Sequence, residues 1–326
     1  MRVLVVGAGA VGQVYGRHLQ LGGAEVTCFV RDKYRAAAER GFDLYVLRRG
    51  RAPSPVRFEG FEVVSRIDEV AARQFDQVYL TVSSAGLTGP WLAELIAATG
   101  DATIVALQPG DDDRTVLRAA GVPDARLVSG MLTLVSYAAP LPGETRFPRP
   151  GMAYWFPPLA PSPMSGPRAG AAVAALRAGH LPAKRHRDVP RAAAFPSAIL
   201  MPLLVALERA GWSLAALARG DALALGVRGA REALTITAAS TGRRISLGAR
   251  LMARPRVLRL ALALARRFMP FPLEVYLHEH FTKVRAQTSL FMTTYLAKAR
   301  LAGLAVPALE QLTSPAALPA PPPGDT

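Results

Sequence analysis

The sequence predicts an α/β protein in which an N-terminal, doubly wound parallel sheet is followed by an all-helical C-terminal domain. Three observations favour this fold class: a glycine-rich turn after a short apolar strand, an alternation of strands and helices up to about residue 187, and helical patterns beyond it. The chain has 326 residues, of which 51% are hydrophobic, and this is enough for two domains with separate cores.

The first predicted strand and helix enclose a nucleotide-binding turn. A β-branched run over 2–6 is followed by Gly7, Gly9 and Gly12 in GxGxxG spacing and by a helix over 10–21. In such a turn the first glycine permits a tight bend, the second lets a pyrophosphate approach, and the third lets the helix pack closely. The helix N-terminus favours bound phosphate. The turn therefore predicts a Rossmann-type domain with cofactor-binding residues Gly7, Gly9, Ala10, Val11 and Gly12.

The end of the second predicted strand, over 25–30, is where such folds recognise the adenosine ribose. Arg31, Asp32 and Lys33 follow it. An acid there would accept a hydrogen bond from the 2′-hydroxyl of NAD, whereas two cations favour a 2′-phosphate. Arg31 and Lys33 therefore predict NADP(H) as the cofactor. Asp32 keeps NAD as an alternative, and a further alternative is that both cations are only solvated surface residues.

The rest of the N-terminal domain follows from short apolar runs. They predict strands over 77–82, 103–107, 126–135 and 151–156, and helices over 91–98 and 169–179. The stretch PPLAPSPMSGP has the composition of a surface loop. Three acids, Asp111 to Asp113, precede a helix over 114–120 and are expected to cap it and to complement its dipole. We predict that this domain covers residues 1–187 and binds ligands outside the carboxyl ends of its strands.

Residues 188–312 are predicted to form the helical domain. AFPSAILMPLLVALERAG is apolar nearly all round, as in a buried central helix that Pro202 would kink, and a second helix is expected over 221–239. The segment 243–267 holds eight arginines and no acids. It is consistent with a membrane-surface helix, a nucleic-acid patch or a solvated basic rim, and we favour the rim because no nucleic-acid motif accompanies it. The tail, 313–326, is rich in proline and small residues and is expected to be disordered.

The last predicted helix runs over 276–301. His278 and His280 flank Glu279, but residues two apart point to different sides of a helix, so no metal site is predicted. Glu279, Lys283 and Gln287 are four apart and are expected to share one face, where Lys283 is the leading candidate for a general acid. The alternative is a surface ion pair between Glu279 and Lys283.

Composition limits the compartment and the partners. The formal net charge is +15, which favours anionic partners, and the only cysteine is Cys28, which excludes an internal disulfide and fits a reducing compartment. The N-terminus shows no signal-peptide pattern, and the longest apolar stretches, 198–207 and 257–265, are too short to span a bilayer. We expect a cytoplasmic protein with no membrane span and no nucleic-acid partner.

GAGAVGQVYGRHLQLGGAEVTCFVR, the later DQVYLTVSSA and the closing AGLAVP together resemble the ketopantoate reductase (2-dehydropantoate 2-reductase) family. The similarity extends from residue 1 to about 312 and is densest at the N-terminus. It implies a Rossmann domain, an all-helical domain, and a cleft between them in which NADPH reduces a 2-keto acid. Members are commonly dimers, so the resemblance also raises a homodimer as an expectation.

The sequence departs from this family at its reactive positions. The resemblance places a lysine and an asparagine near the cofactor where this chain has Ser83 and Pro109, and we assign both residues to the cofactor site. A family lysine and two asparagines on the first helix of the second domain correspond to Ala193, Ser197 and Met201. A family serine and glutamate fall near Val275 and Gln287.

Reduction of a ketone needs a donor that stabilises and protonates the developing alkoxide, and alanine cannot serve. The sequence therefore predicts an NADP-dependent reductase for a small-molecule carbonyl compound that is less anionic and more apolar than ketopantoate. The predicted catalytic residues are Lys283, Ser197, Gln287 and Glu279. The alternative is a non-catalytic NADP(H)-binding protein, which the loss of the lysine and asparagines motivates.

Overall fold

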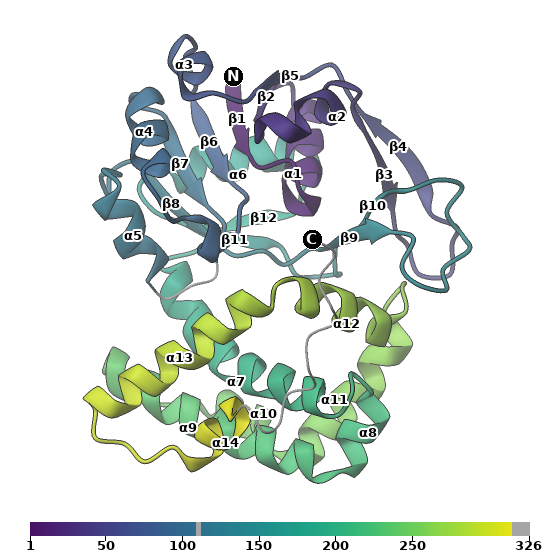
Figure 1. Ribbon diagram of the computed structural model, residues 1–326, viewed down its shortest axis with the longest axis vertical. Helices are drawn as coiled ribbons and strands as arrows, with labels where there is room; N and C mark the ends of the chain where they lie inside the picture. The colour runs from purple at the N-terminus through teal and green to yellow at the C-terminus, as the bar shows by residue number, and fades with distance from the viewer. Residues whose placement is uncertain (109–111, 315–326) are drawn as a thin grey trace. The chain divides into compact units, whose positions relative to one another are not determined.

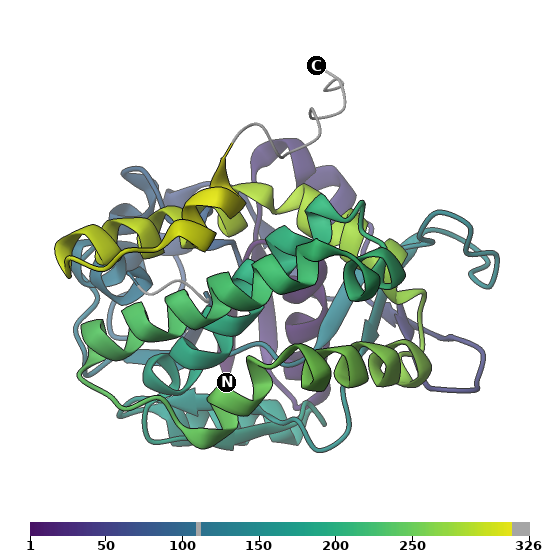
Figure 2. The ribbon, with the colours of Figure 1, turned by 90° about the horizontal axis from the view of Figure 1, so that it is seen from below.

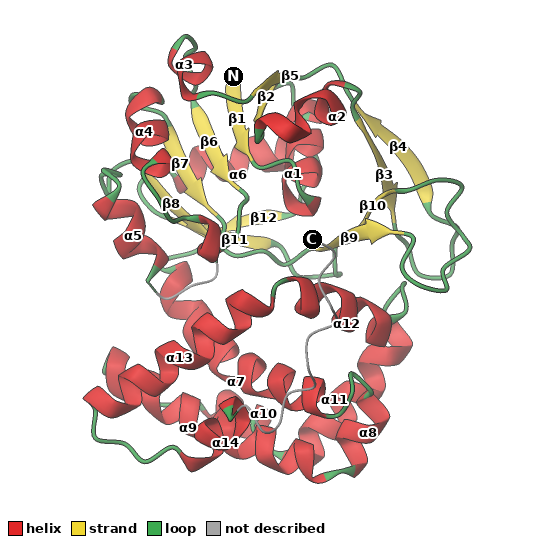
Figure 3. Cartoon of the chain, in the orientation of Figure 1, coloured by secondary structure: helices red, strands yellow, loops and turns green. Residues whose placement is uncertain are grey.

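The structure, a computed structural model, describes residues 1–108 and 112–314, apart from the side chain of Arg266. The chain divides into two compact units: unit 1 covers residues 1–191 and unit 2 covers residues 192–326. The division falls four residues later than the predicted boundary after residue 187. In the part of the chain that is described, the strands belong to unit 1 and unit 2 is helical (Figure 3). The α/β fold class, with an N-terminal parallel sheet and a helical C-terminal region, is confirmed.

The main sheet of unit 1 has the order β12-β11-β8-β7-β6-β1-β2-β5 among the described residues (Figure 1). Its strands are β1 (Arg2–Val6), β2 (Glu25–Phe29), β5 (Glu62–Val64), β6 (Gln77–Leu80), β7 (Thr103–Ala106), β8 (Leu127–Gly130), β11 (Ser162–Ser165) and β12 (Ala183–Arg185). Six adjacent strands of this sheet run parallel to one another: β8, β7, β6, β1, β2 and β5. The chain reverses its winding direction between β1 and β6, so the crevice at their carboxyl ends is the place where such sheets bind ligands.

Helices cover both faces of this sheet. They are α1 (Ala10–Leu21), α2 (Arg35–Glu39), α3 (Ile67–Ala71), α4 (Trp91–Ala98), α5 (Asp113–Ala119) and α6 (Ala169–Ala178), with short 3-10 turns η1 (Asp32–Tyr34) and η2 (Ser84–Gly86). Val3 and Val5 of β1 pack in one core cluster with residues of α1 and α6. Leu4 and Val6 pack on the other side with residues of α4 and α5. Because strand side chains alternate between faces, an unbroken apolar run is what a sheet buried on both sides requires.

A second sheet, of order β4-β3-β10-β9, was not expected from the sequence. It consists of β3 (Phe42–Val46), β4 (Ser54–Phe58), β9 (Val135–Ala139) and β10 (Gly151–Trp155). Phe58 and Tyr154 from this sheet lie in the same core cluster as α1. His18 of α1 is buried beside Tyr154, and burial lowers the pKa of its imidazole.

Two predictions in this region were wrong. The single strand expected over 126–135 is two strands in different sheets, since β8 ends at Gly130 and β9 begins at Val135. The stretch PPLAPSPMSGP is not a surface loop throughout, because Ser162–Ser165 forms the buried strand β11, antiparallel to β8. Pro163 is accommodated in β11 although prolines are rare inside sheets.

Unit 2 consists of helices in the residues that are described, and their colours follow the chain in Figure 2. They are α7 (Val189–Arg209), α8 (Leu214–Arg219), α9 (Asp221–Thr241), α10 (Leu247–Met252), α11 (Pro255–Phe268), α12 (Leu273–Lys283), α13 (Arg285–Leu301) and α14 (Pro307–Thr313). The predicted tail overlaps the end of α14, and residues 315–326 lie outside the described part.

Helix α7 is longer than its apolar core predicts. It has 21 residues with Pro196 and Pro202 inside it, and by length and composition it would be long enough to cross a membrane. Half of its most apolar window is buried within the protein, as in the core helix of a globular domain. Length and composition alone are weak grounds for a membrane span.

Candidate functional site

The glycine turn has the backbone geometry that its three glycines predict. Gly7 has φ +93°, a conformation that L side chains rarely adopt, and its amide donates to the Phe29 carbonyl at 2.9 Å. A Cβ atom on Gly12 would lie 1.9 Å from the Gly7 carbonyl oxygen, so helix α1 packs too closely for any side chain there. A Cβ atom on Gly9 would meet nothing within 4 Å among the described atoms. The second glycine therefore borders open space, and the third is enclosed.

Thr81 and Gln13 hold this turn from either side, and sequence reasoning missed both. The Thr81 hydroxyl lies 2.7 Å from the Gly7 carbonyl oxygen and 2.9 Å from that of Val6. The buried Gln13 amide donates to the Ala8 carbonyl at 2.8 Å. The carbonyl groups of Val6, Gly7 and Ala8 are thus engaged by protein, whereas the first amides of α1 have no acceptor within the helix. A polar residue at the end of β6 and another just after Gly12 were the available signals.

These features fit a dinucleotide. Helix α1 begins at Ala10 without an acidic residue in its first turn and without a side-chain cap on Gly9, so its positive end is not neutralised locally. Val11 is half-buried, and Ala10 lies at the first turn beside Gly9. A pyrophosphate needs open space, backbone amides that can donate hydrogen bonds, and the positive potential of a helix N-terminus.

The adenosine end of the site carries exposed cations. Arg31 directly follows β2 and its flanking residue Val30, and it forms no ion pair with any residue that the structure describes. Lys33 is also exposed, and its Nζ lies 5.0 Å from the centre of the Tyr34 ring. Asp32, unlike these two cations, is held by a neighbouring strand end, because its carboxylate accepts a hydrogen bond from the Ser65 hydroxyl at 3.0 Å.

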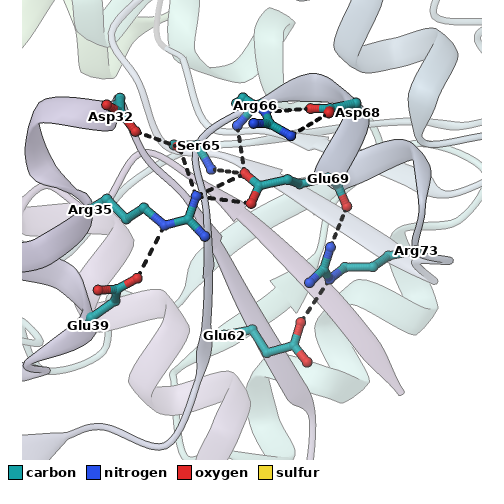
Figure 4. Close-up of polar contacts among 9 residues, drawn as sticks. All are labelled: Asp32, Arg35, Glu39, Glu62, Ser65, Arg66, Asp68, Glu69 and Arg73. Carbon is teal, nitrogen blue, oxygen red and sulfur yellow. Dashed lines mark hydrogen bonds and ion pairs between the residues drawn. The ribbon is translucent and has the colours of Figure 1, made fainter.

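Ser65 belongs to a polar network that holds β5 and α3 against α2 (Figure 4). Arg35 donates to Glu69 at 2.9 Å and to Glu39 at 3.2 Å, and the Ser65 amide donates to Glu69 at 2.9 Å. These contacts, of which the hydrogen bond from the Ser65 backbone is the largest cause, lower the pKa of Glu69 to about 2. Asp32 is thus tied to a structural network, whereas Arg31 is not.

Two further positions lie at the ends of β6 and β7. Ser83 is exposed where β6 leads into η2, while the next residue, Ser84, is buried and donates to Asp113 at 2.7 Å. Asp113 is therefore a buried partner of Ser84 in the first turn of α5, where an acid complements the helix dipole, and the N-cap residue Asp112 makes no side-chain capping hydrogen bond. The expected capping hydrogen bond was wrong for Asp112, whereas the expected acid in the first turn is present as Asp113. Pro109 and Asp111 lie outside the described residues.

In unit 2 the predicted catalytic residues come from three helices. Ser197 is half-buried on α7, flanked one turn away on either side by Ala193 and Met201. Glu279 and Lys283 are exposed on α12. Glu279 lies 3.3 Å from His278, and among the described residues no ion pair joins it to Lys283.

The continuous last helix was a wrong prediction. The chain leaves helical geometry at Val284, which has φ −105° and ψ 24°, so α12 ends at Lys283 and α13 begins at Arg285. Gln287 is therefore not on the same helix face as Glu279 and Lys283. Both polar atoms of the Gln287 side chain are buried without a hydrogen-bond partner among the described residues. Buried amides without partners are rare, and they mark places where a ligand or water completes the site.

The environment of His280 disfavours its charged form. Burial, followed by the charge of Lys283, lowers the pKa of His280. Its ring stacks on Tyr276 with centroids 5.3 Å apart. In the described part of the chain no three His, Cys, Asp or Glu side chains are grouped closely enough to hold a metal ion.

Unit 2 also contains an apolar cavity of about 790 Å³ that is open to solvent. Phe195, Ile199 and Leu203 line it from one face of α7, and Leu258 and Leu262 line it from α11. Of the described residues that line it, Arg243 alone is charged. By helix geometry Phe195, Ile199 and Leu203 lie roughly 120–160° around the axis of α7 from Ser197. Ser197 is not among the described residues that line the cavity. Such a volume and lining are typical of a small-molecule site.

The fold and the site define a class: a Rossmann-type oxidoreductase fold with a dinucleotide turn and an added helical unit. Residues 3–158 match the family model described as ketopantoate reductase PanE/ApbA. This match covers just under half of the chain, and over residues 3–158 the resemblance to the ketopantoate reductase family that was inferred from the sequence is confirmed.

Solved structures agree at the level of the fold. A PanE/ApbA family ketopantoate reductase from Ralstonia eutropha JMP134 is similar with a TM-score of 0.70 and 19% identity, covering 96% of each chain. A 2-dehydropantoate 2-reductase from Geobacter metallireducens GS-15 has a TM-score of 0.68 and 18% identity, covering 96% of this chain and 97% of the other. A D-mandelate dehydrogenase, in a ternary structure with NADH and anilino(oxo)acetate, has a TM-score of 0.69 and 15% identity over 96% of each chain. None of the curated proteins matches the sequence.

Proposed function

We propose that this protein is an NADPH-dependent reductase of the ketopantoate reductase superfamily that acts on an apolar carbonyl compound other than ketopantoate. The observation that carries the proposal is the open space at Gly9 beside the positive end of α1, together with the exposed Arg31 at the end of the second strand. Gly7, Gly12 and the amides of Ala10 and Val11 would hold the pyrophosphate. Arg31 and Lys33 would bind the 2′-phosphate.

The chain supplies the other requirements of a carbonyl reduction. NADPH, when bound, supplies the hydride. A protein group must then hold and protonate the oxygen of the reduced carbonyl, which contributes to the rate as a general acid. We propose Lys283 for this role, with Ser197 and the unpartnered amide of Gln287 as hydrogen-bonding groups toward the substrate and Glu279, one turn before Lys283 on α12, as a further polar residue of the site.

Two features of unit 2 support an apolar substrate: two polar positions of the family are apolar here, and the helices form an apolar cavity. Ala193 and Met201 stand where the family resemblance places a lysine and an asparagine, so an anionic substrate would lose its partners there. The apolar lining of the cavity in unit 2 supports a ligand with hydrocarbon groups.

Replacement of Arg31 tests the cofactor assignment. We expect Arg31→Ala to weaken NADPH binding by about tenfold or more, because a charge-assisted hydrogen bond to the 2′-phosphate is lost. NADH binding should remain weak and unchanged. The measurement is a fluorescence titration of each protein with NADPH and with NADH.

The control is Arg118→Ala, which removes an exposed arginine of α5 that forms an ion pair with Asp124. This variant should bind NADPH like the wild type. Equal affinity of the wild type for the two nucleotides would contradict the assignment and favour NAD through Asp32. An Arg31→Ala variant with the NADPH affinity of the wild type would show that Arg31 does not bind the 2′-phosphate.

Turnover separates the reductase from the second candidate, a non-catalytic NADP(H)-binding protein that the lost lysine and asparagines favour. We expect NADPH oxidation with one or more aryl or alkyl ketones and 2-keto acids, and we expect Lys283→Met to lower kcat by about 100-fold or more while NADPH affinity stays unchanged. Lys184→Met, on β12, is the control. A protein that binds NADPH tightly but oxidises it with no substrate of this panel would favour the binding protein.

A further inference from the structure

The arginine-rich segment forms an exposed surface that the proposed reductase does not use. We define the α10–α11 surface as Leu247 and Leu251 of α10, Leu260 and Leu264 of α11, and the exposed arginines around them. These arginines are Arg244, Arg250, Arg254, Arg256, Arg259 and Arg267. The exposed fractions are 72% for Leu247 and 62% for Leu260.

Helix α11 is apolar over a wider arc than the core of unit 2 can cover. Leu258 is buried, and with Leu262 it faces the apolar cavity. Leu260 and Leu264, one turn apart, lie on the outer side and are 62% and 47% exposed. Arg256 and Arg267 fall next to this outer stripe at 100° per residue. Single exposed leucines are common on protein surfaces, but a stripe bordered by cations has the pattern of an interfacial helix.

The positive charge of this surface is not neutralised by the protein. None of its six arginines forms an ion pair with an acid in the part of the chain that the structure describes. The sequence contains no acid between Arg243 and Leu273. In unit 1, by contrast, arginines form ion pairs with acids, such as Arg35 with Glu69 and Arg168 with Asp101. The surface therefore presents hydrocarbon and uncompensated positive charge together.

We propose that the α10–α11 surface docks onto a membrane containing anionic lipid. Phosphate headgroups would meet the arginines, and the leucines would enter the boundary with the acyl chains. A nucleic acid would use the arginines but leave the leucines in water. A second copy of the same surface would cover the leucines but bring like charges together. Only an anionic lipid surface uses both features, and α11 lies along it without spanning it.

Vesicle sedimentation tests this proposal with the full chain. We expect the protein to sediment with vesicles of equal parts phosphatidylcholine and phosphatidylglycerol, to stay in solution with phosphatidylcholine alone, and to be released as salt rises. The double variant Leu260→Gln, Leu264→Gln should bind the anionic vesicles about tenfold more weakly or worse. The double variant Arg256→Gln, Arg267→Gln should lose about fivefold for each arginine.

Two controls keep the result specific. The double variant Arg300→Gln, Leu301→Gln changes the same residue types at the exposed end of α13 and should bind vesicles like the wild type. Thermal unfolding and NADPH affinity of every variant should match the wild type, which shows that both units remain folded.

Several outcomes would overturn the proposal. One is no sedimentation with either vesicle, or equal sedimentation with both. Another is binding to anionic vesicles that the leucine variant does not reduce, because the surface would then be only electrostatic. Retention on a DNA duplex without vesicle binding would assign the arginines to nucleic acid, and self-association that the leucine variant abolishes, again without vesicle binding, would assign the surface to a second copy.

Discussion

The Gly9→Ala variant is expected to fold like the wild type and to lose about tenfold or more in NADPH affinity. A methyl group on Gly9 meets no atom of the described residues within 4 Å, so it enters the open space where the pyrophosphate would approach. The cost to stability should stay within about 1 kcal/mol, since glycine is only moderately better than alanine at an N-cap. Titration with NADPH and denaturant unfolding measure the two effects separately.

Gly12→Ala is the matched variant, and its main expected effect is on stability. Its Cβ atom would lie 1.9 Å from the Gly7 carbonyl oxygen and 2.8 Å from the Thr81 hydroxyl, so α1 must move away from the sheet. We expect a loss of about 3 kcal/mol or more in the free energy of unfolding, together with the loss of nucleotide binding. Unchanged NADPH affinity in Gly9→Ala would show that the nucleotide does not cross this turn, and a stable Gly12→Ala would show that α1 is not packed against it.

Gly179→Ala is expected to destabilise unit 1 as much as Gly12→Ala does, although Gly179 lies far along the chain from the nucleotide turn. A Cβ atom on Gly179 would lie 1.6 Å from the His18 carbonyl oxygen, where the end of α6 crosses α1. The same crossing holds the His18 imidazole, whose Nδ1 donates to the Gly179 carbonyl at 2.6 Å. Separation of the two helices should lower the free energy of unfolding by about 3–5 kcal/mol, measured by denaturant unfolding.

Gly170 offers a control on the same helix. A Cβ atom there would meet only the Arg185 Cδ, at 4.0 Å. Gly170→Ala should therefore stabilise unit 1 by about 0.5–1 kcal/mol, because alanine is the better helix former. If both variants have the same stability as the wild type, the close crossing of α1 and α6 is wrong.

Local signals in the sequence determined the nucleotide half of this protein. The strand over 2–6, the glycine spacing and the helix over 10–21 appear in the structure with the predicted bounds. These elements depend on neighbouring residues: a β-branched run for the strand, glycines for the turn, and amphipathic periodicity for the helix. For the same reason the sequence placed Arg31 at the end of the second strand, and it indicated both the fold class and the family.

Contacts between residues distant in the chain decided the remainder. Ser162–Ser165 forms a strand despite its loop-like composition, because β8 and β12 offer it partners on both sides. The break at Val284 moved Gln287 away from the helix face of Glu279 and Lys283, and no proline or glycine at that point announces it. The pairing of Ser84 with Asp113 joins residues 29 positions apart.

The sequence by itself thus determined the elements whose residues stabilise them locally, namely the nucleotide turn and the helical nature of unit 2. Only the tertiary structure decided which side of Gly9 is open, which glycines are enclosed, which leucines of α11 face the cavity and which face water. The physical reason is that a pattern of residue types fixes the conformation of a segment, whereas burial and open space depend on which distant segments pack against it.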